Sequence, residues 1–565
     1  MAHSPLQNLL CSALSLDGEA IAAVSAQVGN GIPLTQALAE VCGDVKTAQV
    51  VAKVLGLPLA VHAADLQPDP VWLKRIPMRV WTAARALPLP CAEDASALRV
   101  AFADPLDATA LDTVRTAAGG VMPQVVVAPR QLLHEALREH LGVGADTVQS
   151  LVDERGEETG GRGEVDLAAD AEDASIIRLV NQVLQEALER RATDVHFEPF
   201  EGRFAVRYRV DGMLVEAKLP PEVRRLQAAI VSRLKILAQL DIAEKRLPQD
   251  GRIKLRLLGR EVDVRVSIIP MLHGEAVVLR LLDRSAALVG LKGTGMGGRD
   301  LELFQRALDL PHGIVLVTGP TGSGKTSSLF AGLSRINQPD LKIVTIEDPV
   351  EYQLDGINQI QVDTRTGLTF AKGLRAILRH DPDVVLIGEI RDRETAEIAV
   401  QASLTGHLVL STLHTNDAPG AVSRLIDMGV EPFLVASTLE LVMAQRLVRL
   451  LCSHCKEPLD ASARLDAARV LSGFDGPVYG PGHASKGCRE CGGTGYKGRC
   501  GIFEMMPMTA QLRHLAGERS TSQALRKIAN ANGMVSLRDD GLRLVKEGRT
   551  SVEEVLRNTH DGELH

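Results

Sequence analysis

The segment Gly319–Thr326, GPTGSGKT, constrains this chain more than any other part of its sequence. It matches the pattern GxxxxGK[ST], in which glycines let the backbone curl so that its N–H groups cradle nucleotide phosphates. The apolar run Ile314–Thr318 predicts a buried parallel strand before the loop. Ser327–Ile336 predicts a helix after it, with its N-terminus facing the phosphates. Strand, loop and helix together predict a nucleotide-binding α/β domain rather than a chance glycine-rich turn.

The loop residues have distinct expected roles. Lys325 is expected to contact the β- and γ-phosphates, and the Thr326 hydroxyl to hold Mg²⁺. The expected nucleotide-binding residues are Gly319, Pro320, Thr321, Gly322, Ser323, Gly324, Lys325, Thr326 and Ser327. The chain is therefore predicted to handle a nucleoside triphosphate.

Composition narrows the class of protein. A length of 565 residues with 45% apolar residues predicts several domains with packed cores. A net charge of −8 and only 3% aromatic residues argue against a general nucleic-acid binder. No apolar run is long enough to span a bilayer, and the N-terminus lacks the basic flank of a signal peptide. We therefore expect a cytoplasmic protein without a transmembrane segment.

Patterns of apolar, acidic and turn-forming residues divide the chain into six parts. They are an N-terminal α/β module, an acidic linker, a second α/β domain, the nucleotide domain, a cysteine-rich subdomain and a helical tail. The linker has almost no apolar residues and cannot bury enough surface to order itself. The expected boundaries are 1–150, 151–174, 175–290, 291–446, 447–505 and 506–565.

Local patterns predict elements inside these parts. In the second domain, helical spacing covers Ser175–Arg190, and strand-like runs flank a helix around Glu222–Gln239. Those runs are Phe204–Val210 and Val262–Ile268. Thr550–Glu553 predicts a capping box at the start of the last helix.

Acidic residues end two predicted strands of the nucleotide domain. Glu389 follows the apolar run Val384–Ile387, and the Asp usual just before such a Glu is Gly388 here. Glu347 and Asp348 end the run Ile343–Ile346. Glu347 and Glu389 are therefore expected to help hold Mg²⁺ or to polarise the attacking water, and the sequence does not decide which of them activates it.

Two histidines flank the next predicted strand. Ligands of open α/β sheets bind outside the carboxyl ends of strands, so His414, at the end of the strand, is predicted to sense the γ-phosphate. His407, at its start, is either a second sensor or a structural hydrogen-bonding residue.

Two arginines alternate along the strand of the second domain. Arg207 and Arg209 therefore point to one face, where they could reach a γ-phosphate or form a solvated strand face.

Five of the eight cysteines lie between Cys452 and Cys500. Two CxxC pairs suit a closed tetrahedral zinc site better than two pairs of ordinary thiols. The expected ligands are Cys452, Cys455, Cys488 and Cys491, with His454 and Cys500 as bystanders.

Residue by residue, these segments resemble the secretion ATPases of type II secretion systems, in the wider family that includes type IV pilus motors. Glu347–Glu351 resembles the aspartate box of that family, Gly388–Asp392 its atypical Walker B segment, and Thr405–Asp417 its histidine box. The second domain carries further similar segments, and the resemblance covers about residues 176–560. Those further segments are Ala192–His196, Val206–Gly212 and Arg246–Arg252.

The resemblance implies a RecA-like ATPase core preceded by a PAS-like domain. It implies a homo-hexamer that hydrolyses ATP with Mg²⁺, carries Zn²⁺ in its tetracysteine subdomain and is held peripherally at the inner membrane by a platform protein. At least one of Arg207 and Arg209 would then contact the γ-phosphate and couple hydrolysis to domain rotation, and the sequence does not decide which.

The N-terminal module resembles the family more loosely, chiefly in Arg99–Asp107. Some members bind cyclic di-GMP there through an Arg-Leu-Gly motif. Leu34 and Gln36 stand where the Arg and Gly are expected, so the resemblance implies partner docking instead.

Three alternatives stay open. A type IV pilus assembly motor is the runner-up, although Gly367–Arg379 is more similar to the secretion branch. A DNA-binding or DNA-translocating phosphate-loop protein would combine the loop with zinc knuckles, against the acidic balance of the chain. A non-hydrolysing nucleotide sensor would not need Lys325, Thr326 and both glutamates.

Overall fold

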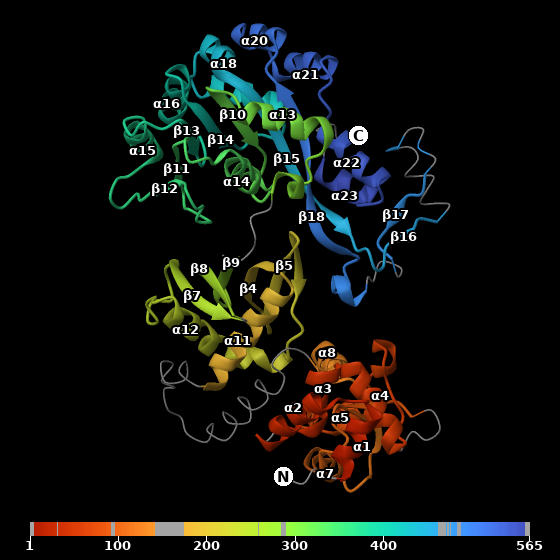
Figure 1. Ribbon diagram of the computed structural model, residues 1–565. Helices are drawn as coiled ribbons and strands as arrows, with labels where there is room; N and C mark the ends of the chain where they lie inside the picture. The colour runs from red at the N-terminus through yellow and green to blue at the C-terminus, as the bar shows by residue number, and fades with distance from the viewer. Residues whose placement is uncertain are drawn as a thin grey trace. The chain divides into compact units, whose positions relative to one another are not determined.

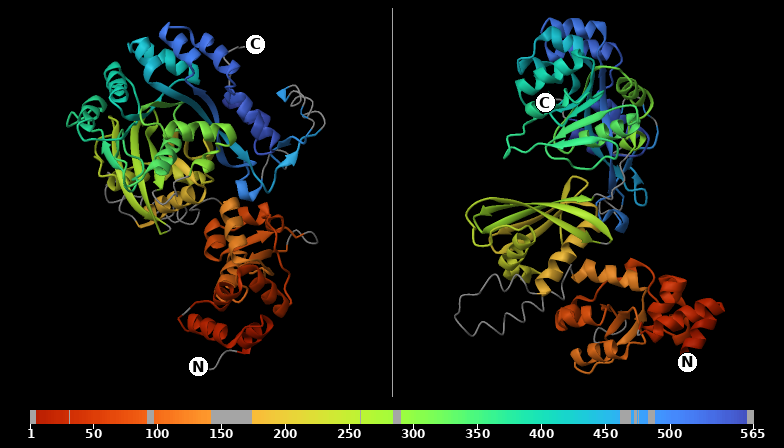
Figure 2. Two further views of the ribbon diagram at one scale, coloured as in Figure 1. Left: turned by 45° about the horizontal axis from the view of Figure 1, so that its top comes forward. Right: turned by 60° about the vertical axis from the view of Figure 1, so that its left-hand side comes forward.

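In the computed structural model, the chain folds into two compact units, Met1–Leu282 and Asp283–His565 (Figures 1 and 2). None of the helices described is both long and apolar enough to cross a bilayer. Residues 151–173 of the predicted linker lie outside the described part. The described residues are 5–30, 32–91, 97–141, 174–257, 259–283, 290–460, 470, 471, 474, 476–482 and 488–559.

The N-terminal module joins a helical part to a small sheet. The helical part buries Leu10, Val24, Leu38 and Val51 in a core of its own. In the sheet, β1 is antiparallel to β2, and β2 is parallel to β3. The elements are α1 (Pro5–Ala13), α2 (Gly18–Gly29), α3 (Leu34–Cys42), α4 (Asp44–Leu55), η1 (Ala63–Leu66), α5 (Pro70–Arg75), α6 (Met78–Ala83), β1 (Ala86–Leu89), β2 (Arg99–Phe102), α7 (Ala108–Ala117), β3 (Gln124–Val127) and α8 (Arg130–Leu141).

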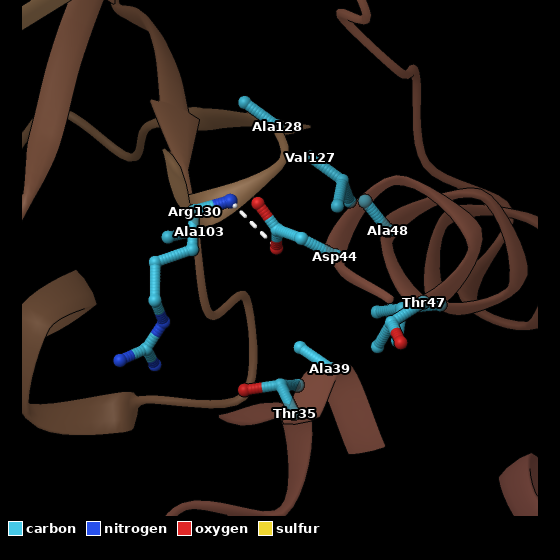
Figure 3. A pocket seen from close by; sticks show the side chains of 10 residues that line it. Thr35, Ala39, Asp44, Thr47, Ala48, Ala103, Val127, Ala128 and Arg130 are labelled. Atoms are coloured by element: carbon cyan, nitrogen blue, oxygen red, sulfur yellow. Dashed lines mark hydrogen bonds between the residues drawn. The ribbon is translucent and has the colours of Figure 1, made fainter. Parts of the chain in front are cut away.

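A small cavity lies where the helical part meets the sheet (Figure 3). At its edge, Asp44 caps helix α8: its carboxylate accepts from the backbone N–H groups of Arg130, at 2.9 Å, and Gln131, at 2.8 Å. The Arg130 Nη1 donates to Gln36 Oε1, at 2.7 Å. Gln36 thus takes part in joining the two halves of the module.

The second domain is a six-stranded sheet in the order β6-β5-β4-β9-β8-β7. Apolar side chains of α11 and α12 share one core with the strands, including Leu184, Leu234 and Tyr208. The predicted strands and helix are confirmed as β5, β8 and α12. The elements are α11 (Ala174–Glu189), β4 (Ala192–Phe200), β5 (Arg203–Val210), β6 (Met213–Glu216), η2 (Pro221–Leu226), α12 (Gln227–Leu237), β7 (Gln249–Leu257), β8 (Arg260–Met271) and β9 (Gly274–Asp283).

The nucleotide domain is built on a sheet in the order β12-β11-β13-β14-β10-β15-β18 (Figure 1). The first six are parallel, as predicted, and only β18 runs antiparallel to its neighbour β15. Helices connect the parallel strands that follow one another in the chain, except β11 and β12, which are joined by a loop. The strands are β10 (Gly313–Thr318), β11 (Ile343–Glu347), β12 (Asn358–Gln361), β13 (Val384–Ile387), β14 (Leu408–Leu413), β15 (Leu439–Leu451) and β18 (Tyr496–Pro507).

Helices cover both faces of this sheet. Ile314 and Leu316 of β10 pack in one core with α15, α16, α17, α20 and α21, whereas Val315 and Val317 pack in the other with α13 and α14. The remaining elements are η3 (Leu291–Thr294), α13 (Gly298–Leu308), α14 (Lys325–Ile336), α15 (Phe370–Ile377), α16 (Arg393–Leu404), α17 (Ala418–Asp427), α18 (Pro432–Thr438), β16 (Glu457–Pro458), β17 (Tyr479–Gly480), η4 (Arg489–Cys491), α20 (Ala510–Gly517), α21 (Ser522–Ala531), α22 (Leu537–Lys546) and α23 (Val552–Asn558).

The last helix begins one residue later than the predicted capping box. Ser551 is the N-cap of α23, and its hydroxyl accepts from the Glu554 N–H at 3.2 Å. The Thr550 hydroxyl instead donates to the Arg449 carbonyl, at 2.7 Å. Tertiary hydrogen bonding to β15 therefore selects the second of two adjacent capping residues.

Candidate active site

The phosphate loop leaves the buried end of β10 through glycines with positive φ. The φ angles are 151° at Gly319, 78° at Gly322 and 86° at Gly324. A Cβ on Gly319 would lie 2.5 Å from the Gln445 carbonyl oxygen, and one on Gly324 would lie 2.8 Å from Gln445 Nε2. Larger residues are therefore excluded, because β15 packs directly against the loop. The loop opens into the N-terminus of α14, the positive end of the helix dipole.

Lys325 is folded back onto the loop. Its Nζ donates to the carbonyls of Gly319, at 2.8 Å, and Pro320, at 3.0 Å, and only 9% of the residue is exposed. Burial lowers the pKa of Lys325 to about 8. The Ser323 hydroxyl in the same loop is buried and has no hydrogen-bond partner among the described residues. The Lys325 ammonium and the Ser323 hydroxyl are thus two donors in the loop that the oxygens of a bound phosphate could accept from.

The lowered pKa of Lys325 predicts that nucleotide binding takes up a proton in alkaline solution. Near pH 8 about half of the lysines are neutral, and a phosphate raises their pKa because it favours the ammonium form. Affinity for a triphosphate analogue should therefore fall as pH rises from about 7.5 to 9. Titration calorimetry in HEPES and in Tris would measure the proton uptake. A pH-independent affinity over this window would contradict the prediction.

Glu389 and His414 meet at the carboxyl edge of the sheet, because their strands β13 and β14 are parallel neighbours. The His414 Nε2 lies 3.2 Å from Glu389 Oε2, and Arg391 forms an ion pair with the other oxygen. The Glu389 side chain is 14% exposed and that of His414 is 48% exposed. The pair is therefore open to a bound ligand.

Glu347 ends the adjacent strand in a more enclosed setting. Its Oε1 accepts from Thr345 Oγ1, at 2.6 Å, and from Gln359 Nε2, at 3.0 Å, and 4% of the residue is exposed. Burial raises its pKa, and both hydrogen bonds oppose that rise. Glu347 is thus held more firmly than Glu389.

Gly388 lies where two parallel strands end side by side. A Cβ there would be 3.3 Å from both Glu347 Cα and the Ile346 carbonyl oxygen, which is tighter than ordinary van der Waals contact. Any side chain at position 388 therefore requires the end of β11 to shift by a few tenths of an ångström.

His407 lies at the opposite, amino edge of the sheet. Its Nδ1 is 2.9 Å from the Ala402 carbonyl oxygen and 3.1 Å from Thr405 Oγ1. This position, before the first residue of β14, favours the structural hydrogen-bonding role over phosphate sensing.

Arg207 and Arg209 point to one face of their sheet, as alternation predicts. The Arg207 guanidinium donates to Glu198 Oε1, at 2.6 Å, and this carboxylate raises its pKa. The Arg209 Nε lies 3.8 Å from Asp194 Oδ2. Both arginines belong to the first compact unit, so their contact with a nucleotide stays a prediction.

The four cysteines of the two CxxC pairs converge, with all Sγ atoms within 4.8 Å of one another. The distances are 3.7 Å between Cys452 and Cys488 and 3.9 Å between Cys455 and Cys491. Sulfurs in a tetrahedron at about 2.3 Å from zinc are about 3.8 Å apart, whereas a disulfide needs about 2.05 Å. The arrangement therefore fits a zinc ion.

The surroundings favour the thiolate of one member of this cluster, Cys491, whereas burial raises the pKa of Cys488 and raises that of Cys455 to about 12. Burial opposes the charged form of Cys491, but N–H groups of Cys488 and Gly495, each 3.1 Å from its Sγ, lower its pKa to about 7. Cys500 is buried in β18, and its Sγ accepts from Arg549 at 3.5 Å. Cys500 and His454 are not members of the cluster, as expected.

Gln445 and Arg446, on β15, line the loop and were not predicted from the sequence. The Arg446 Nη1 lies 3.2 Å from where a Cβ of Gly319 would be, and its Nη2 donates to the Asn416 carbonyl at 2.9 Å. They lie in the middle of β15, so the rule about strand ends that points to His414 does not find them, and they match no motif.

Comparison with known proteins places this site in a family. The model described as Type II/IV secretion system protein matches residues 169–557. The chain belongs to this family. A second model, the MshEN domain, matches residues 55–146. As a family member the chain is an ATPase, and the predicted resemblance is confirmed.

Individual relatives agree with this membership. Type II secretion system protein E of Pseudomonas aeruginosa is 55% identical over 396 residues, which cover 70% of this chain and 78% of that protein. Type IV pilus assembly ATPase PilB of Myxococcus xanthus is 44% identical over 544 residues, 94% of each chain. The X-ray structure of the Legionella pneumophila ATPase DotB matches with a TM-score of 0.50 at 22% identity, over 66% of this chain and 94% of that one, and shares the fold.

Proposed function

We propose that this chain is the ATP-hydrolysing motor that powers protein export across the outer membrane through a type II secretion system. The observation that carries the proposal is the convergence of the phosphate loop and the Glu389–His414 pair at one edge of the sheet. The 55% identity to a type II secretion system protein E supports the choice of machine.

The loop 319–326 would hold ATP. Lys325 would exchange its two carbonyl partners for phosphate oxygens, and Thr326, Glu347 and Glu389 would hold Mg²⁺. When bound, Mg²⁺ neutralises charge that develops on the phosphates. Glu389 would orient the attacking water, with His414 beside it, and the arginines of the second domain would close over the γ-phosphate.

The assembly we propose is a cytoplasmic homo-hexamer. A platform protein of the inner membrane would hold it there through the N-terminal module. Rotation of the second domain against the ATPase domain would transmit the work of hydrolysis.

We also propose that the cysteine cluster binds one structural Zn²⁺. Because folding and binding of a tetrathiolate site are coupled, Cys455→Ser should lose the metal and lower the melting temperature by about 5–15 °C. Metal content by mass spectrometry and thermal melting of the full chain would test this. Cys500→Ser is the matched control, a buried cysteine outside the cluster that should keep the zinc. Unchanged zinc content in the Cys455 variant would overturn the assignment.

A chromosomal Lys325→Ala exchange in the native host tests the proposed function. Removing the phosphate-binding ammonium should trap folded hydrolases in the periplasm while surface pili and twitching stay intact. Western blots of medium and periplasm, with a pilus count, would show this, and the plasmid-borne wild-type gene should restore secretion.

The second candidate is a type IV pilus assembly motor, favoured by 44% identity to such an ATPase over 94% of the chain. Normal secretion with lost pili in the Lys325→Ala strain would establish it and overturn the secretion proposal.

A further inference from the structure

The segment Thr415–Ala418 follows His414 directly and is fastened by side chains from several other elements. Its backbone N–H at Thr415 donates to Thr318 Oγ1 of β10, at 2.9 Å. The Asn416 carbonyl accepts from Arg446 of β15, at 2.9 Å. The path of the chain beyond His414 is therefore set by groups distant in the sequence.

Asp417 is the central residue of this segment. One oxygen accepts from the Gly420 N–H at 2.7 Å and caps helix α17. The other accepts from Arg526 Nη2, at 2.6 Å. Arg526 belongs to α21, which packs against α17.

Glu504, on β18, provides the second anchor. It is 2% exposed, and its Oε1 accepts from the Ala418 N–H at 2.8 Å. The Arg526 Nη1 donates to its Oε2, at 3.3 Å. Burial raises the pKa of Glu504, and the Ala418 N–H and the Arg526 charge oppose that rise. The Arg526 guanidinium thus joins Asp417 to Glu504, the acid that accepts from the next backbone N–H, that of Ala418.

His414 depends on this anchoring. Its ring is 48% exposed and contacts Glu389 through a single 3.2 Å interaction, so packing around the ring does not fix it. On the preceding side, Leu413 is fixed in buried strand β14. On the following side, the anchored Thr415–Ala418 segment fixes the backbone from which the ring projects.

We propose that Arg526 is a positioning residue for the ATPase site, acting through Asp417 and Glu504 to hold His414 against Glu389. The inference rests on the ATPase activity of the family and not on the choice between secretion and pilus assembly. Helix α21 thereby contributes to hydrolysis without touching the nucleotide.

Arg526→Gln tests the proposal, with Arg513→Gln as the matched control. Arg513 also ties a C-terminal helix to the core, donating to Glu440 Oε2 at 2.6 Å and the Ala436 carbonyl at 2.7 Å, but it does not touch the segment after His414. We expect Arg526→Gln to reduce kcat about 5- to 20-fold, with the Kd of a triphosphate analogue within twofold of wild type. Arg513→Gln should lower the melting temperature to a similar extent and leave kcat within twofold.

A double-variant cycle separates positioning from stability. Asp417→Asn keeps a capping side chain and loses the ion pair, so it should lower kcat like Arg526→Gln, and the two losses should not multiply when combined. Arg526→Lys should restore part of the rate. Multiplying losses, or equal kcat losses in the Arg526 and Arg513 variants, would overturn the proposal. If the Gln variant fails to fold, the Lys and Asp417 variants carry the test. A wild-type chain that binds ATP without turnover would instead contradict the proposed motor.

Discussion

Glu389→Gln should reduce ATP turnover by about two to three orders of magnitude while leaving nucleotide affinity nearly unchanged. The amide keeps the size of the side chain, but it loses the ion pair with Arg391 and cannot accept a proton from water. Its position at the open carboxyl edge suits the group that orients the nucleophile. Steady-state hydrolysis and binding of a fluorescent ATP analogue would measure the two effects separately.

Glu347→Gln is the informative comparison, because the sequence alone does not distinguish the two acids. Glu347 is occupied by two hydrogen bonds and 4% exposed, so its exchange should affect Mg²⁺ dependence more than the rate at saturating Mg²⁺. A Glu389→Gln variant with wild-type ATP turnover, together with a Glu347→Gln variant that does not hydrolyse ATP, would reverse the assignment of these roles.

Gly388→Asp, which would restore the usual Walker B acid, should inactivate the protein rather than improve it. The new Cβ would meet Glu347 Cα and the Ile346 carbonyl at 3.3 Å, and a second carboxylate would stand beside the buried Glu347. Overpacking of this kind costs about 1–3 kcal/mol, and the like charge adds to that cost. We expect a melting temperature about 5–10 °C lower and at least a tenfold loss of turnover.

Two controls isolate the cause. Gly388→Ala carries the steric part without the charge and should show a smaller loss. Gly297→Asp places the same residue at the N-cap of α13, where a Cβ meets nothing within 4 Å, and should be neutral. A Gly388→Asp variant with wild-type stability and faster hydrolysis would contradict the steric explanation.

Features whose chemistry is contained in a short segment could be predicted from the sequence. The loop from Gly319, the parallel strands and the two CxxC pairs are each recognised by a local sequence pattern. The structure brings the four cysteines together as expected. The rule about strand ends placed His414 at the carboxyl edge of the sheet, but its contact with Glu389 depends on β13 and β14 being neighbours, which the sequence did not predict.

Contacts made by single side chains across long sequence separations could not be predicted. Arg526 and Asp417 are 109 positions apart, and nothing in the sequence around Arg526 marks it as different from other helical arginines. Gln445 and Arg446 are polar residues in the middle of a strand and match no motif. Such contacts depend on which helix packs on which face, which only the folded chain determines.

Strand β15 connects the nucleotide and cysteine sites without an intervening loop. Gln445 and Arg446 contact the phosphate loop, and Cys452 follows the last residue of the same strand, about 20 Å further on at about 3.3 Å per residue. Pairing with β18 and the Arg449–Glu554 ion pair, at 2.6 Å, stiffen the stretch between them. The cysteine cluster is therefore joined to the phosphate loop by one continuous paired strand. A displacement of the cluster along this strand would reach the residues that contact the phosphate loop without passing through a connecting loop.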